Sequence, residues 1–139
     1  MRKIVLDRVD TCVSLCAEDK RETNYVPVAK VAGTFSGGSE LAEALGVGHK
    51  ADHLVGAAVR ASLCVGVNSG VPGPGYYEMA KQLGALKANA SDVEKFLYFK
   101  TQRDKLGVPI NAKATTLGVS LGVVFCWCGC GKAVLDCQL

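Results

Sequence analysis

Cysteines near the C-terminus are the side chains whose type and spacing most directly suggest chemistry. The segment from Cys126 to Cys130 places thiols at every second position, with Cys128 between them, and Cys137 follows. On a strand the first three would share one face, and the fourth could complete a tetrahedral thiolate site for zinc or an iron–sulfur cluster. The spacing differs from the CxxC of most structural zinc sites, and no second pair lies upstream. We therefore predict no metal and no cofactor, with a site at Cys126, Cys128, Cys130 and Cys137 as the alternative.

Two histidines form the second candidate. His49 and His53 are four positions apart, so their imidazoles could converge on one metal ion if this segment is a helix. The glutamate of HExxH is absent, however, and two exposed histidines near the start of a helix explain the pair better. No Ser/His/Asp arrangement and no phosphate-binding glycine motif occurs elsewhere. We therefore expect a protein that is not an enzyme.

Composition limits the remaining classes of function. The chain has 139 residues, enough for one domain or for a modest domain and an anchor, and its mean hydropathy is +0.21. A net charge of +3 is too small to favour nucleic acid as a partner. Seven cysteines are an odd set, and Asp7 and Asp10 interrupt the apolar segment that a signal peptide would need, so a disulfide framework is not predicted. Most of them are expected to be reduced packing residues.

The longest uncharged run of the chain extends from Ala114 to Gly131. As a helix rising about 1.5 Å per residue, it would nearly cross the roughly 30 Å hydrocarbon core of a bilayer. We therefore predict a transmembrane helix over residues 113–134, followed by a short tail over 135–139. Gly118, Ser120 and Gly122 provide the small-residue spacing that lets two spanning helices approach closely.

Basic residues precede this run. Lys95–Lys113 contains five basic residues and one acid, which predicts that the N-terminal side faces the cytoplasm or the mitochondrial matrix. Ser91 and Glu94 form a capping box at the start of a helix that ends at Gly107, so residues 92–107 are predicted to be an amphipathic interfacial helix. The side chains expected at the lipid interface are Lys100, Arg103, Lys105, Lys113 and Trp127.

Residues 1–91 are predicted to form a helical extramembrane region. Apolar spacing favours helices over residues 3–16, 39–45, 49–67 and 76–86, whereas residues 25–38 and 68–75 are expected to be extended chain and loop. The helix over 49–67 is apolar on most sides, so a second membrane span there is an open alternative.

Part of the basic and uncharged region resembles a known family. Over residues 96–124, the segment Leu106-Gly-Val-Pro-Ile110, followed by Lys113 and Thr115-Thr-Leu-Gly118, resembles subunit VIIa of cytochrome c oxidase. That family has a basic amphipathic segment, a Gly-x-Pro turn, a lysine and one spanning helix. The resemblance implies a small accessory subunit of a respiratory complex in the mitochondrial inner membrane, with its N-terminal side in the matrix and no catalytic residues of its own.

The sequence thus predicts a mainly α-helical protein with one C-terminal transmembrane helix. Its expected function is structural: it would contact larger membrane subunits and membrane lipids and stabilise a respiratory-type complex. Two alternatives remain open. One is a soluble α/β domain whose cysteine-rich C-terminal strand is core or binds a metal. The other is a DNA-binding protein similar to helix-turn-helix proteins, suggested by residues 40–47.

Overall fold

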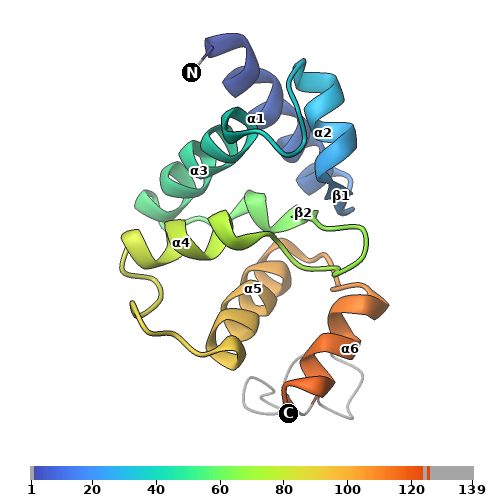
Figure 1. Cartoon of the computed structure of the whole chain (residues 1–139), viewed down its shortest axis with the longest axis vertical. Helices are drawn as coiled ribbons and strands as arrows, with labels where there is room; N and C mark the ends of the chain where they lie inside the picture. The colour runs from blue at the N-terminus through green and yellow to red at the C-terminus, as the bar shows by residue number, and fades with distance from the viewer. Residues whose placement is uncertain (1, 124, 126–139) are drawn as a thin grey trace.

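The described part of the chain is built mainly from helices. This confirms the prediction of a mainly α-helical protein. The computed structural model describes residues 2–123 and 125. In Figure 1, α1, α2 and α3 form the upper part, α4 crosses the middle, and α5 and α6 lie below. The elements in chain order are α1 (Lys3–Glu18), β1 (Thr23–Asn24), α2 (Tyr25–Ala32), α3 (Ser39–Leu54), the 3-10 helix η1 (Arg60–Leu63), β2 (Cys64–Val65), α4 (Pro74–Gln82), α5 (Asp92–Leu106) and α6 (Ala112–Ser120).

The first helix is the one predicted over residues 3–16. Val5, Val9, Val13 and Cys16 recur at helical spacing, and all four are buried. Val5 and Val9 pack in one apolar cluster with side chains of α2 and α3. The buried face of α1 therefore holds the upper three helices together.

The segment after β1 is helical, so the prediction of extended chain over residues 25–38 is wrong for its first half. Pro27 lies in the first turn of α2, where its missing N–H has no helical partner to lose. Val28, Ala29 and Ala32 are buried against the core, and Gly33 ends the helix in the left-handed conformation. Burial of this apolar face outweighs the weak local signal.

The third helix differs from both predictions for its region. It runs through Gly46 and Gly48 to Leu54, so the helix predicted to end at residue 45 continues and the turn required by the helix-turn-helix alternative is absent. A Cβ at Gly46 would lie 3.1 Å from the Met79 side chain of α4, so glycine permits close helix contact there.

The helix predicted over residues 49–67, and with it the second membrane span, is also wrong. α3 ends at Leu54, and a loop leads into η1 and β2. The Asp52 carboxylate accepts hydrogen bonds from the Arg60 backbone N–H at 3.0 Å and from the Arg60 guanidinium. This local pairing turns the chain back, and Gly56 takes the left-handed conformation within the turn.

A short parallel pairing of β1 and β2 joins the chain before α2 to the chain after η1. Thr23 of β1 pairs with Cys64 of β2, and Asn24 pairs with Val65. The Asn24 side chain also donates to the Val65 carbonyl at 2.8 Å. The pairing thereby fixes the start of α2, which holds Tyr25, relative to η1, which holds Ala61.

The capping signals of α5 are confirmed. Ser91 and Glu94 form the reciprocal capping box, and Gly107 ends the helix at a φ of 70°. Phe96 and Phe99 are buried on its inner face, and Phe99 packs against Tyr76 of α4. Sequence signals confined to a few neighbouring residues thus located both ends of this helix.

Where the structure describes the predicted transmembrane helix over residues 113–134, the chain is helical as far as Ser120. α6 ends at Ser120, and Gly122 takes a φ of 88° while the Val123 N–H donates to the Gly118 carbonyl. These contacts close the helix in the manner of a left-handed cap. Within residues 2–123 and 125, no helix has the length and apolar character needed to cross a bilayer. The rest of the predicted span, residues 124 and 126–134, lies outside the described residues.

Candidate functional site

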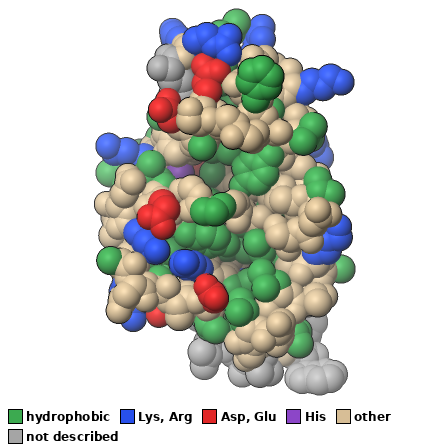
Figure 2. All heavy atoms as spheres, viewed as in Figure 1, with side chains coloured by type: hydrophobic (Ala, Val, Ile, Leu, Met, Phe, Trp, Pro, Cys, Tyr) green, Lys and Arg blue, Asp and Glu red, His purple; other side chains and the backbone are tan. Residues whose placement is uncertain are grey.

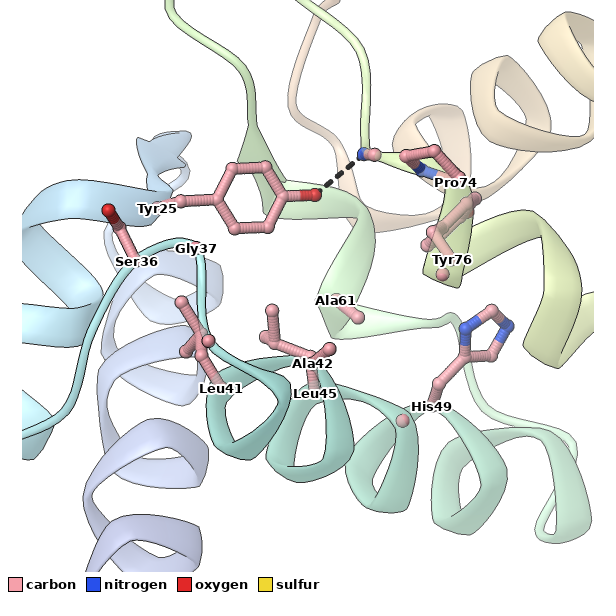
Figure 3. Close-up of a pocket in the computed structure, with 14 residues that line it drawn as sticks. Tyr25, Ser36, Gly37, Leu41, Ala42, Leu45, His49, Ala61, Pro74 and Tyr76 are labelled. Atoms are coloured by element: carbon pink, nitrogen blue, oxygen red, sulfur yellow. Dashed lines mark hydrogen bonds between the residues drawn. The ribbon is translucent and has the colours of Figure 1, made fainter.

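A mainly apolar cavity of about 280 Å³ lies between the α2–α3 loop, α3, η1 and α4. Figure 2 shows a hollow on this face, with histidine atoms visible inside it. None of the lining residues is Asp, Glu, Lys or Arg, and Figure 3 shows how they surround the cavity. They are Tyr25, Ser36, Gly37, Gly38, Leu41, Ala42, Leu45, Gly46, His49, Ala61, Gly73, Pro74, Gly75 and Tyr76.

One face of α3 forms the long wall of this cavity. Leu41, Leu45 and His49 recur every fourth residue and therefore lie above one another along the helix. The two leucines make this wall apolar, and His49 adds a polar group at its C-terminal end. Ala61 of η1 lies between α3 and α4 (Figure 3), where its small side chain leaves the space open.

His49 is the only imidazole of the lining, and it is almost fully buried, with 1% of its surface exposed. Its Nε2 is hydrogen-bonded to the Tyr98 hydroxyl at 2.8 Å, and its ring lies 4.8 Å from the Tyr76 ring between centroids. Figure 3 shows the other ring nitrogen, Nδ1, turned toward the cavity. Among the described residues, no group is hydrogen-bonded to Nδ1, and this atom keeps some contact with open space, since no described side-chain N or O atom is both fully buried and unpaired.

Burial decides the charge of this imidazole. Burial, with a smaller contribution from the charge of His53, lowers the pKa of His49 to about 4, while Asp52 opposes the shift. His49 is therefore neutral near pH 7. A neutral imidazole has one nitrogen that donates and one that accepts, so Nδ1 can play either part according to what Tyr98 does at Nε2.

Tyr25 closes the opposite side of the cavity. Its hydroxyl oxygen accepts a hydrogen bond from the Gly73 N–H at 2.7 Å, drawn as the dashed line in Figure 3. This bond ties the start of α2 to the loop before α4. Burial raises the pKa of Tyr25 to about 12, so the phenol keeps its proton at neutral pH.

Tyr76 completes the wall on the α4 side. It is 8% exposed, and its hydroxyl is hydrogen-bonded to the buried Ser62 hydroxyl at 2.5 Å. The polar end of Tyr76 is thus already paired within the protein. Its ring, which also contacts the Tyr98 and Phe99 rings, offers an aromatic surface to the cavity.

The predicted environment of His49 was wrong. We expected His49 and His53 to be exposed near the start of a helix, whereas His49 lies inside α3 and is buried. The four-residue repeat of Leu41, Leu45 and His49 was the available signal. The tyrosines that surround His49 come from α4 and α5, so periodicity within one helix could not have identified them.

The glycine predicted to pack against another spanning helix packs within the chain. Gly118 of α6 is buried, and a Cβ there would lie 2.6 Å from a ring carbon of Phe96 in α5. Ser120 and Gly122 are exposed. Close helix contact at Gly118 is therefore real, and the partner helix belongs to the same molecule.

Two of the predicted lipid-contacting cations are buried in the fold. Lys100 pairs with Asp104 at 2.6 Å and Arg103 pairs with Glu22 at 2.7 Å, with side-chain exposures of 3% and 0%. Neither cation reaches a lipid headgroup in this arrangement, so that prediction is wrong for both. Lys105 and Lys113 are exposed, and Lys113 donates to the Val67 carbonyl at 2.6 Å.

The remaining predicted site residues fall in the C-terminal segment. Trp127, Cys126, Cys128, Cys130 and Cys137 lie outside the described residues. In the part of the chain that is described, no group of three or more His, Cys, Asp or Glu side chains is arranged to hold a metal ion.

Comparison with known proteins adds no assignment. No protein family, curated protein or solved structure matches this chain. The resemblance to subunit VIIa and the accessory-subunit role therefore stay predictions.

Proposed function

We propose that this protein is a non-enzymatic binding protein for a small, uncharged, mainly apolar molecule, held in the cavity between α3 and α4. The observation that carries the proposal is the lining: apolar side chains, no charged group, and one buried neutral imidazole facing inward. Binding sites for small molecules commonly combine such an apolar surface with a few placed polar groups.

Size supports a ligand of one or two rings. An apolar cavity of about 150 Å³ in another protein holds benzene, and the present cavity of about 280 Å³ is larger. A charged ligand is disfavoured, because moving an ion from water into a site without an opposite charge is costly.

Titration with toluene tests this proposal. We expect saturable backbone amide shifts in NMR spectra at Leu41, Leu45 and Ala61, with a Kd on the order of 1 mM, as befits so small a ligand. Benzoate, of similar size but charged, should produce no saturable shifts at these residues.

Matched variants separate binding in the cavity from binding elsewhere. Ala42 is exposed on the cavity wall, so Ala42→Phe should fold normally, place a ring in the cavity and weaken toluene binding at least about tenfold. Ala88→Phe introduces the same ring in the exposed loop before α5 and should leave binding unchanged. The absence of saturable shifts in the wild type, or unchanged binding in Ala42→Phe, would overturn the proposal.

The accessory-subunit role is a separate prediction and rests largely on the C-terminal segment. Washing membranes from cells that express the protein with alkaline carbonate tests it. Retention of the chain in the pellet until detergent is added would support an anchor, and release into the supernatant would contradict it.

A further inference from the structure

The polar groups of the cavity specify more about the ligand than its apolar walls do. We infer that the ligand is a ring compound bearing one hydroxyl or carbonyl group, and that this group is hydrogen-bonded to Nδ1 of His49. The inference rests on the proposed function, since it concerns the same cavity.

The first argument is the unequal pairing of the two imidazole nitrogens. Nε2 of His49 is held by the Tyr98 hydroxyl at 2.8 Å, whereas Nδ1 faces the cavity without a partner among the described residues. Leaving a buried polar group unpaired costs about 1–3 kcal/mol. An apolar ligand that displaced water from Nδ1 would incur this cost, and a hydroxyl or carbonyl at that point would remove it.

The second argument concerns what Nδ1 can accept as a partner. Burial raises the pKa of Tyr98 to about 12, so its phenol stays protonated and can either donate to Nε2 or accept from it. If Tyr98 donates, Nδ1 carries the hydrogen and binds a carbonyl oxygen. If Tyr98 accepts, Nδ1 is an acceptor and binds a hydroxyl group.

The third argument is the aromatic wall beside His49. The Tyr76 ring lies 4.8 Å from the imidazole, tilted by 38°, and its hydroxyl is engaged by Ser62. A ligand group at Nδ1 therefore places the adjoining part of the ligand beside the Tyr76 ring and Ala61. Flat apolar rings pack well against such a surface.

Toluene and p-cresol provide the test, because they share a ring and a methyl group and differ by one hydroxyl. In a cavity without a partner for the hydroxyl, p-cresol should bind more weakly, since its hydroxyl would lose water and gain nothing. We expect p-cresol to bind at least about fivefold more tightly than toluene, the gain typical of one hydrogen bond. The Nδ1 resonance of His49 should reach a different position at saturation with p-cresol than at saturation with toluene, because only p-cresol offers this nitrogen a hydrogen bond.

Two variants identify the group that holds the hydroxyl. His49→Phe should abolish the preference for p-cresol while toluene still binds, and His53→Gln, at a histidine of α3 outside the cavity lining, should retain the preference. A preference for p-cresol that persists in folded His49→Phe would overturn the role of His49. If His49→Phe does not fold, the Nδ1 resonance of the wild-type protein decides the question.

The outcomes for the two proposals differ. If both compounds bind in the cavity and p-cresol binds no more tightly than toluene, this inference fails and the proposed function stands. If neither compound binds, the proposed function fails and this inference fails with it.

Discussion

Arg103 and Glu22, separated by 81 positions in the sequence, form an ion pair of 2.7 Å in which the arginine side chain has no exposed surface. The guanidinium also donates to the Val108 carbonyl at 3.0 Å and to the Ser62 carbonyl at 3.3 Å. Glu22 in turn accepts from the side chain of Asn111, the residue that caps α6. One buried cation therefore connects α5, η1, the chain before β1 and the start of α6.

Removing the carboxylate of this pair should destabilise the protein. Glu22→Ala leaves Arg103 charged and buried, so we expect the free energy of unfolding to fall by about 3 kcal/mol, at the low end for a broken buried pair because Glu22 is partly exposed. Glu78→Ala is the control, since its pair with Lys81 is exposed and should contribute less than about 1 kcal/mol. Urea unfolding measures both, and equal effects would contradict the role of Glu22.

The close contact between α6 and α5 predicts that even a methyl group at position 118 lowers the stability of the protein. Gly118→Ala places a Cβ within 2.8 Å of two ring carbons of the buried Phe96, which has little room to move. We expect a loss of about 1–2 kcal/mol in the free energy of unfolding, which exceeds the gain of somewhat under 1 kcal/mol from helix propensity.

Gly75→Ala is the matched control for this variant. Gly75 also lies in a helix, and a Cβ there would have no heavy atom within 4 Å. Its stability should stay the same or rise slightly. A Gly118→Ala protein as stable as the wild type in thermal or urea unfolding would show that the contact with Phe96 is not close.

Because His49 is buried in its neutral form, the stability of the protein should depend on pH. The folded protein holds the imidazole unprotonated down to a pKa of about 4, whereas the unfolded chain takes up a proton near pH 6.5. The free energy of unfolding should therefore decrease as the pH falls from about 6.5 to about 4, by at most about 3 kcal/mol from this group. Above pH 6.5 the contribution of His49 should be constant.

Variants separate His49 from the other titrating groups. Urea unfolding at about pH 7.5 and about pH 4.5 gives the decrease for each protein. The decrease should be smaller in His49→Phe than in the wild type, and His53→Gln should keep most of it. An unchanged decrease in His49→Phe would contradict this prediction.

Burial also predicts unequal reactivity among the first three cysteines. Burial raises the pKa of the Cys64 thiol to about 12 and raises that of Cys16, so neither forms the reactive thiolate readily. Cys12 is partly exposed. Brief treatment of the native protein with iodoacetamide, followed by peptide mass spectrometry, should find Cys12 alkylated well before Cys16 and Cys64. Equal rates in the native protein would contradict the burial of the latter two.

Short-range signals predicted the elements whose ends depend on neighbouring residues. The capping box of Ser91 and Glu94 and the glycine at position 107 located α5, and the spacing of Val5, Val9 and Val13 located α1. Hydrogen bonds within four residues and one apolar stripe suffice for such helices. α2 was missed because its stability comes from packing on α1 and α3, which is not visible in an eight-residue segment.

The sequence alone established that the run from Ala114 to Gly131 carries no charge and that small residues recur within it at positions 118, 120 and 122. Only the folded chain determined that Gly118 meets Phe96, that Gly122 adopts a left-handed turn, and that α6 ends at Ser120. The same holds for the cavity, since the presence of His49 was evident and its burial beside tyrosines of α4 and α5 was not. Composition and periodicity describe residues that are close in the sequence. Burial and pairing depend on contacts between segments that are far apart in the sequence and meet only in the folded chain.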